Sequence, residues 1–505
     1  MFEAYFFDKR TTMNYRVYRV LKALEASTFT VNRLSQEAQL SYSQAYNAFQ
    51  DIMADLQVLQ HTQVEIADED AYRKLSQNVT VDQYRYHLLT QSMSFAFFDY
   101  LFKACDPDVH TFCSEHDISI STLRRRVDAF KNYLQTKGVS LNTSSWALEG
   151  SELRIRMVIL NFFILGYRGA GWPLDDTNYQ ATLSEYGRIA KKYPDQWFTI
   201  QHQSKQDLLA ICVQQLRMHQ GHYLPQEQAF TRLTQAPGMP TLPPVVQAPT
   251  PRDAVNESGY FYFLRMHYLS LSTELTATDH WLITHFQQRN DEITAFADGL
   301  LNTLLQAAPA DAAESDPTAH ELLRANLYRM SYSYWLFGGD FSRRIDFYDD
   351  DKHASTFGRL PALIDQYFDQ LQGPVAVFMP YRTIMKRVIY SVLRSDFPVL
   401  DADHQLAVAV LIEPGTFALR DVLHFLDGIS FVRLTTAHEQ AAVDVILTTL
   451  TSPELINEYY GPSHPPVIQW QAMAAEEDYY RLYAQLLHRH QAKMAAATKV
   501  DHPAS

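Results

Sequence analysis

Cysteine is scarce in this chain, which contains only Cys105, Cys113 and Cys212 and no Cys-x-x-Cys pair. An odd and widely spaced set of cysteines argues against a disulfide framework or a zinc site and predicts reduced thiols in a cytosol. Long apolar runs are also missing. The most apolar stretch, residues 157–165, is interrupted by Asn161 and falls well short of the roughly 20 residues that cross a bilayer. Because the N-terminus also lacks a signal-peptide pattern, we expect a cytoplasmic protein without a membrane segment.

Motifs of catalysis and of metal or nucleotide binding are absent as well. The sequence has no phosphate-binding GxxxxGK loop followed by Ser or Thr, no GxSxG nucleophile elbow and no HExxH zinc motif. The acidic runs at residues 175–176 and 349–351 flank turns and are typical of solvated surface. We therefore expect a protein that is not an enzyme and that holds neither a metal nor a cofactor.

Basic residues are outnumbered, since the 505 residues include 43 Lys and Arg against 57 Asp and Glu, a net charge of −14. That balance disfavours a generic nucleic-acid binder. The acidity is uneven, because residues 1–157 hold 17 basic and 19 acidic side chains and so carry only −2 of the total. This near-neutral third can present a local basic face, while the acidic remainder would be repelled by DNA and would orient the protein on it. The length itself predicts roughly three to five domains.

Residues 109–156 have the pattern of a helix, a tight turn, a second helix and a two-stranded wing. We expect a short helix over Val109–His116, a turn over Asp117–Ser119 and a second helix over Thr122–Gln135, with Ser121 as the N-cap of the second. The apolar residues of the second helix recur at helical spacing. They predict one buried stripe made of Leu123, Val127, Phe130 and Leu134.

The second helix should end at Gly138, and two alternating segments, Val139–Leu141 and Trp146–Leu148, predict strands around an Asn-Thr-Ser-Ser turn. This order is typical of a winged helix-turn-helix, whose second helix enters the major groove while nearby cations meet the flanking phosphates. The residues that we expect to contact DNA are Ser121, Thr122, Arg124, Arg125, Arg126 and Lys131. The alternative is a solvated helix face, but the position of the arginines in the motif favours DNA contact.

A second candidate helix-turn-helix precedes this one, in residues 10–60. Thr30 would cap a helix over Val31–Ala38, and residues 39–41 would form the turn before a helix over Ser43–Leu56. That last helix has no Lys or Arg, so its polar candidates for DNA contact are Ser43, Gln44 and Asn47. Amides can read base edges but bind phosphate weakly without cations. A packing or spacer domain is the alternative.

The rest of the chain divides into a helical part and a mixed part. The aromatic-rich run Asp82–Cys105 should be one helix with a buried aromatic face. Further helices are expected at Glu152–Tyr167, Asn178–Lys192, Ser204–Gln220, Gly259–Ser270, Thr278–Gln306, Thr318–Leu336 and Leu360–Leu371. The proline-rich residues 236–252 should be a mobile loop or linker. Beyond residue 373 we expect a small, mostly parallel α/β sheet with helices over Tyr381–Ser395 and Ala474–Arg489. Its strands would be Pro374–Met379, Leu406–Ile412, Ser430–Leu434, Val443–Leu447 and Pro466–Gln469.

Two DNA-binding units, two helical bundles and an α/β tail, in this order, resemble the Mga/AtxA family of bacterial transcription regulators. The resemblance is sharpest over residues 10–160, above all in SISTLRRRVDAFKNYLQTKGVSLNTSSWALEGSELRIR. It implies a mainly α, multidomain protein whose bundles are similar to the PRD domains of phosphotransferase-regulated proteins and whose tail is similar to an enzyme IIB domain. The domains we expect are two helix-turn-helix domains at 1–65 and 66–160, bundles at 161–275 and 276–372, and the tail at 373–505.

The resemblance implies a regulator, an activator of a virulence or carbohydrate regulon, that binds double-stranded promoter DNA as a homodimer joined by its C-terminal domain. It also implies bundles that respond to the sugar phosphotransferase system through a phosphocarrier protein. The candidate phosphorylation sites are His219 and His222, beside Arg217 at a predicted helix end, where the helix dipole favours a charged imidazole. A solvated helix end is the alternative.

The first predicted strand of the tail leads into Met379 and Pro380 without a cysteine, so we expect a structural or dimerising module and not a cysteine phosphocarrier. Two other functions stay open for the whole chain. An RNA-binding antiterminator is disfavoured, because a winged helix-turn-helix suits the major groove of B-DNA better than the deep, narrow groove of RNA. The other is a non-catalytic interaction protein of the phosphotransferase system.

Overall fold

The computed structural model describes residues 1–24, 30–62, 69–168, 170–192, 205–225, 228–270, 274–308, 317–347, 359–393, 397, 405–412, 417–429, 431–435, 443–471, 474 and 476–501. The chain separates into two compact units. The first consists of Met1–Leu269, Thr276–Arg289 and Tyr332–Asp350, and the second of Ser270–Leu275, Asn290–Ser331 and Asp351–Ser505. No helix within the described residues is both long and apolar enough to cross a membrane.

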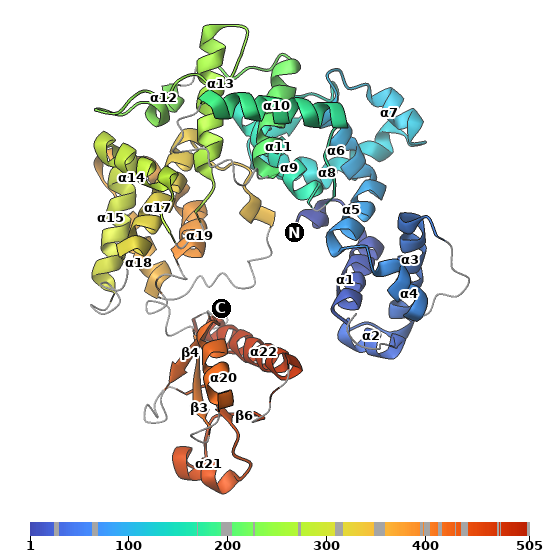
Figure 1. The fold of residues 1–505 in the computed structure, drawn as a ribbon, viewed down its shortest axis with the longest axis vertical. Coiled ribbons are helices and arrows are strands. Elements are labelled where there is room, and N and C mark those ends of the chain that lie inside the picture. Colours follow the sequence, from blue (N-terminus) through green and yellow to red (C-terminus); the bar gives the residue numbers. More distant parts are fainter. Residues whose placement is uncertain are drawn as a thin grey trace. The chain divides into compact units, whose positions relative to one another are not determined.

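The N-terminal part of the first unit is a helix-turn-helix with further helices packed on it (Figure 1). Its elements are η1 (Phe2–Tyr5), α1 (Lys9–Leu24), α2 (Val31–Glu37), α3 (Tyr42–Gln60), α4 (Glu69–Ser76) and α5 (Val81–Gln91). The expected helices form because Thr30 caps α2, accepting from the Arg33 amide at 3.2 Å, and because Ser41 and Gln44 make a capping box at the start of α3. The core shared by α1, α3, α4 and α5 includes Tyr18, Leu21, Ile52, Leu56, Tyr72 and Leu88.

The winged helix-turn-helix follows, and its helices form where the sequence predicts them. Its elements are α6 (Met93–Lys103), α7 (Val109–Glu115), α8 (Ile120–Thr136), the antiparallel strands β1 (Val139–Leu141) and β2 (Leu148–Gly150), and α9 (Glu152–Gly166). The predicted N-cap Ser121 is wrong, because Ser119 caps α8 with its Oγ 3.1 Å from the Thr122 amide. The second wing strand begins two residues later than predicted, since Trp146 has a positive φ of 57° and packs its ring on Phe97.

Two of the predicted long helices are each broken in two. Asp82–Cys105 forms α5 and α6, because Ser92 leaves the helical conformation and caps α6. Thr278–Gln306 forms α14 (Ala277–Arg289) and α15 (Glu292–Ala307), because Asn290 has a φ of 45° and Asp291 caps α15. In both places a short polar residue competes for backbone hydrogen bonds and interrupts an otherwise helical pattern.

A helical bundle completes the first unit. Besides α9 and α14 it contains α10 (Asp176–Lys192), α11 (Lys205–His219), α12 (Gln228–Thr234) and α13 (Pro251–His267). The proline-rich segment before α13 is not the expected free linker. The amides of Val245 and Val246 donate to Ser258 Oγ at 2.8 and 2.9 Å, and Val245 is fully buried, so this segment is held on α13.

The second unit contains α15, most of α17 (Pro317–Phe337), α18 (Arg359–Asp369), the 3₁₀ helix η4 (Gly373–Tyr381) and α19 (Arg382–Leu393). The predicted strand Pro374–Met379 is wrong, since these residues lie in η4. Gly373 has a positive φ of 66° and Pro374 has no amide for a strand ladder. The apolar side chains of η4 serve the bundle instead, with the Phe378 ring 4.4 Å from that of Phe296.

The chain ends in a small parallel α/β sheet, as predicted. Its strands are β3 (Leu406–Leu411), β4 (Val432–Thr435), β5 (Val445–Thr448) and β6 (Val467–Gln469), in the order β4-β3-β5-β6. The helices are α20 (Phe417–Asp427), α21 (Pro453–Tyr460) and α22 (Glu476–Asp501), and apolar residues of α20 and α22 join the strands in one core (Figure 1). No cysteine follows β3, whose next residues are Ile-Glu-Pro-Gly-Thr, so the argument against a cysteine phosphocarrier also holds for the observed first strand.

Candidate nucleic-acid interface

The turn before α8 is shaped by short polar side chains. Asp108 caps α7, accepting from the His110 amide at 2.9 Å, and Asp117 reverses the chain with a φ of 50°. Ser119 Oγ then caps α8 and also lies 2.9 Å from Ser121 Oγ and 3.0 Å from Thr122 Oγ1. The predicted DNA contacts Ser121 and Thr122 thus lie in the first turn of α8, with their hydroxyl groups in a local network.

The three arginines of α8 are all exposed, and they diverge because successive helical residues are about 100° apart. The predicted stripe of Leu123, Val127, Phe130 and Leu134 is buried, so the centre of the opposite, exposed face is formed by Ser121, Arg125, Asp128 and Asn132. Arg125 makes no hydrogen bond or ion pair with any residue that the structure describes. Asn132, an amide on the same face, was not selected from the sequence because it lies a full two turns beyond the basic cluster.

Arg124 and Arg126 flank this face and have neighbours within the protein. Arg124 Nη2 donates to the Thr143 carbonyl of the wing turn at 3.1 Å, which joins α8 to the wing. Arg126 lies near Asp8: the Thr11 amide, and to a smaller extent Arg126, hold the pKa of that carboxyl below its usual value. The arginines are therefore not equivalent: Arg125 lies at the centre of the exposed face, and no described residue forms a hydrogen bond or an ion pair with it.

Lys131 is partly committed as well, since its Nζ lies 3.0 Å from Asp128 Oδ1 one turn earlier. An exposed pair at this spacing is weak, so a phosphate could replace the carboxylate as the partner of Lys131.

The side chain of Asn142 orders the wing turn from within. Asn142 Oδ1 accepts from the amides of Ser144 and Ser145 at 2.9 and 3.3 Å, and Asn142 Nδ2 donates to Glu149 across the hairpin at 2.8 Å. The tip of the wing therefore has a defined shape beside α8.

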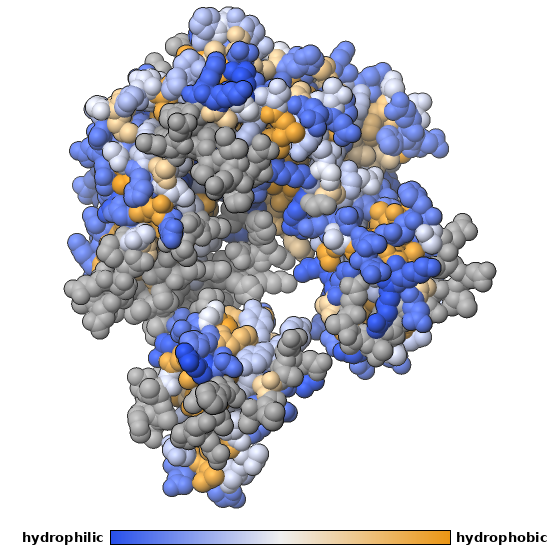
Figure 2. Space-filling model, viewed as in Figure 1, coloured by the Kyte–Doolittle hydropathy of each residue, from blue (hydrophilic) through white to orange (hydrophobic). Residues whose placement is uncertain are grey.

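The earlier helix-turn-helix brings its three predicted contacts to the exposed face of α3. Ser43, Gln44 and Asn47 are all exposed, but the Gln44 side-chain oxygen accepts from the Ser41 amide at 3.0 Å and so serves the cap. The same face carries Tyr42 and Tyr46, which are 55% and 45% exposed and stack with ring centroids 6.3 Å apart. Sequence reasoning missed this pair, although two tyrosines four residues apart on a polar face were a signal. On the face of the molecule in Figure 2, hydrophilic residues dominate and apolar residues form small separate groups among them.

The two candidate histidines differ in their surroundings. His219 is the last residue of α11, and His222 follows the turn made by Gly221; both are exposed. Partial burial and the Arg217 guanidinium lower the pKa of His222, so the expectation that a helix end favours its charged form is wrong for this residue. A neutral imidazole is the form that could accept a phosphoryl group.

One comparison with known proteins concerns the winged helix-turn-helix. Residues 77–163 match the Mga helix-turn-helix domain family. The chain carries a Mga helix-turn-helix domain. This confirms the resemblance over the part of the sequence where it is sharpest, and the matched residues span α5 to most of α9 and include Arg124, Arg125 and Arg126 of α8. The chain is also similar to the capsule synthesis positive regulator AcpB of Bacillus anthracis, with 22% identity over 102 residues. That alignment covers 20% of this chain and 21% of AcpB.

Proposed function

We propose that this protein is a transcription regulator that binds double-stranded promoter DNA through α8 of its Mga domain. The observation that carries the proposal is the exposed arginine face of α8 next to a preformed wing, inside a domain of a helix-turn-helix family. A helix presented in this way can enter the major groove, where an arginine can bind a guanine edge or a phosphate.

Within this proposal each basic residue has its own role. Arg125, at the centre of the exposed face, enters the groove, and Ser121 and Thr122 lie beside it at the start of the helix. Arg126 and Lys131 bind flanking phosphates, exchanging their neighbouring carboxylates for DNA. Arg124 holds the wing at a fixed place relative to the helix through Thr143, and it reaches a phosphate from there.

The finer part of the proposal concerns assembly and control. We propose an activator that acts as a homodimer through its C-terminal α/β domain, with the helical bundles responding to the sugar phosphotransferase system through a phosphocarrier protein and through His219 or His222. The exposure of both imidazoles supports their phosphorylation. The name of the similar protein AcpB, a positive regulator, supports the role of an activator. A phosphoryl group would add about −1.5 to −2 charges next to Arg217.

A direct test is a competition experiment with the full-length chain. A fluorescent duplex selected from a random-sequence pool by the wild-type protein is displaced by unlabelled duplex DNA or by hairpin RNA. We expect duplex DNA to compete and hairpin RNA to fail. Preferential binding of hairpin RNA would overturn the proposal and favour an antiterminator, and failure to select any duplex would favour a non-catalytic interaction protein.

Replacing the three arginines of α8 tests whether they form the binding site, separately from whether the protein binds DNA at all. The triple variant of Arg124, Arg125 and Arg126 to Ala should lose duplex binding while its melting profile stays close to that of the wild type. If the triple variant binds the selected duplex as tightly as the wild type, the interface lies elsewhere.

A further inference from the structure

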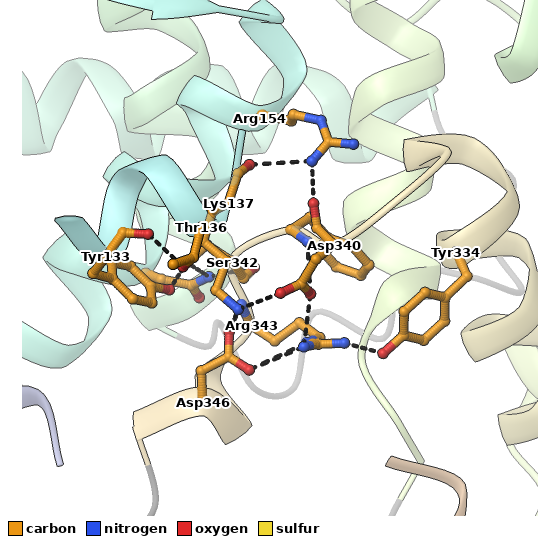
Figure 3. Close-up of polar contacts among 11 residues, drawn as sticks. Tyr133, Thr136, Lys137, Arg154, Tyr334, Asp340, Ser342, Arg343 and Asp346 are labelled. Atoms are coloured by element: carbon orange, nitrogen blue, oxygen red, sulfur yellow. Dashed lines mark hydrogen bonds and ion pairs between the residues drawn. The ribbon is translucent and has the colours of Figure 1, made fainter. Parts of the chain in front are cut away.

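The C-terminal end of α8 contacts a segment that lies about two hundred residues later in the sequence. Residues 337–347, which follow α17, include the short 3₁₀ helix η2 (Arg344–Phe347). Lys137 Nζ, at the end of α8, lies 2.7 Å from Asp340 Oδ2 and 3.0 Å from Asp346 Oδ2. Tyr133 OH lies 2.7 Å from Ser342 Oγ. The Lys137 side chain is only 9% exposed, so the 337–347 segment encloses its ammonium group (Figure 3).

The same segment is bound to α9, the helix behind the wing. Arg154 donates from Nη1 to the Lys137 carbonyl at 3.1 Å and to the Asp340 carbonyl, and from Nη2 to the Phe337 carbonyl at 2.6 Å (Figure 3). Asn161 Nδ2 donates to the Ser342 carbonyl at 2.9 Å. The segment therefore holds the C-terminal end of α8 against α9. Apart from the bond between Arg154 and Lys137, the winged domain cannot make these contacts by itself, because the other partner of each lies in residues 337–347.

Most of the bonds in this contact are hydrogen bonds and ion pairs. Lys137 and Arg343 face Asp340 and Asp346, and Arg343 Nη2 lies 2.8 Å and 3.1 Å from the two carboxylates. Apolar support comes from Phe347, whose ring lies 4.9 Å from that of Tyr133. Ion pairs between partly desolvated groups depend on every partner, because removing one charge leaves the others without compensation.

The origin of the segment suggests why the contact exists. α17 is one continuous helix, but its residues up to Ser331 belong to the second unit and those from Tyr332 to the first. Gly338 and Gly339 follow it at φ values of 55° and 156°, conformations that favour glycine, so the chain leaves the helix abruptly into the contact with α8. If a change in the second unit moved α17 along its axis, the movement would reach Asp340, the partner of Lys137, only three residues after the end of α17 at Phe337.

We propose that residues 337–347 are a coupling segment that sets the position of the recognition helix according to the state of the second unit, with Lys137 as the positioning residue that receives it. This rests on the proposed function, since the position of α8 matters only if α8 meets DNA. The coupling segment holds α8 in its binding orientation against the wing. Breaking the Lys137 pairs releases α8 and weakens DNA binding.

The test uses the full-length chain and the duplex selected by the wild-type protein, with affinity measured by fluorescence anisotropy. Lys137→Met and the double variant Asp340→Asn/Asp346→Asn should each weaken binding at least about fivefold, the lower range of measured coupling between sites. Lys137→Arg keeps the charge and should retain most of the affinity. The matched control is Asp207→Asn in α11, whose carboxylate pairs with Arg265 inside the first unit at 2.6 Å and is about as exposed as that of Asp346.

Hydrogen exchange of the α8 amides gives a second readout that does not need DNA. We expect faster exchange in Asp340→Asn/Asp346→Asn than in the wild type or in Asp207→Asn. If the double variant has both wild-type affinity for the duplex and wild-type exchange of the α8 amides, the proposed role of the coupling segment is wrong. If the wild-type chain binds no duplex at all, the proposed function fails, and the exchange experiment alone then decides whether the segment controls α8.

Discussion

Glu257 in α13 and Arg156 in α9 form an ion pair whose two side chains are both 0% exposed. The carboxylate accepts from Arg156 Nη1 and Nη2 at 2.5 and 2.9 Å, from Gln214 Nε2 at 2.8 Å and from the Leu224 amide at 3.0 Å. The pair joins the Mga domain to the bundle that follows it, because α9 belongs to both. Removing this ion pair should therefore destabilise the whole first unit.

We expect Glu257→Gln to destabilise the first unit by about 3 kcal/mol. Removing one partner of a buried ion pair costs roughly 3–5 kcal/mol, because the other charge stays buried without compensation. Arg156 keeps its bonds to Glu152 and to the His222 carbonyl, at 2.9 and 2.8 Å, which places the cost at the lower end of that range. The first unit spans about 300 residues, so an unfolding entropy of about 2.1 cal/mol/K per residue lowers the melting midpoint by about 5 °C.

Tryptophan fluorescence during a thermal scan measures this directly, because five of the six tryptophans lie in the first unit and only Trp470 lies in the second. The control is Asp128→Asn, which breaks an exposed pair with Lys131. Such a pair contributes about 1 kcal/mol at most, so the control should melt within a few degrees of the wild type. A Glu257→Gln midpoint indistinguishable from that of the control would refute the reasoning.

Three further predictions concern other parts of the first unit. Burial, reinforced by nearby arginines, lowers the pKa of His267 to about 3, so the ring is neutral in the folded protein. The contribution of His267 to the free energy of unfolding is fully present above its unfolded pKa of about 6.5, and it should fall by up to about 1.4 kcal/mol for each pH unit below that value. In urea unfolding, His267→Asn should flatten that slope between about pH 6.5 and 5, and an unchanged slope would contradict the assignment. Arg124→Ala should speed hydrogen exchange in the wing turn with a stability change within about 0.5 kcal/mol; unaltered exchange would mean that the bond to Thr143 does not order the wing. The double variant Tyr42→Ala/Tyr46→Ala should weaken duplex binding less than loss of the α8 arginines does, because the face of α3 has no cation, and anisotropy showing a larger loss would reverse the order of the two helix-turn-helix units.

Local patterns in the sequence predicted the helix-turn-helix units well, because caps and apolar stripes act over a few residues. The errors were also local in origin. Ser119 and Ser121 are equally good caps by composition, and only the position of the turn at Asp117 decides between them. Residues 374–379 are a continuous apolar run like a buried strand, but Gly373 and Pro374 begin a 3₁₀ helix that buries Phe378 in the bundle.

Long-range contacts could not be predicted from one sequence. Lys137 looked like an ordinary residue near a helix end, because its partners Asp340 and Asp346 lie about two hundred positions away. The three arginines looked like one basic cluster, and only the placement of the wing and of Asp8 distinguishes them. The exposure of the α8 arginines was thus predictable from the sequence, whereas the contacts that distinguish them depend on what packs around the helix.

The salt dependence of duplex binding tests most directly whether the exposed face of α8 meets the DNA backbone. The wild type is compared with Arg125→Ala/Arg126→Ala and with Lys191→Ala/Lys192→Ala, which removes the same charge from the exposed end of α10. Between about 50 and 200 mM salt, the slope of log affinity against log salt should flatten by about 0.9 for each phosphate that the arginine variant no longer binds, and the lysine variant should keep the wild-type slope. Equal slopes and affinities for all three proteins would contradict the placement of DNA on α8.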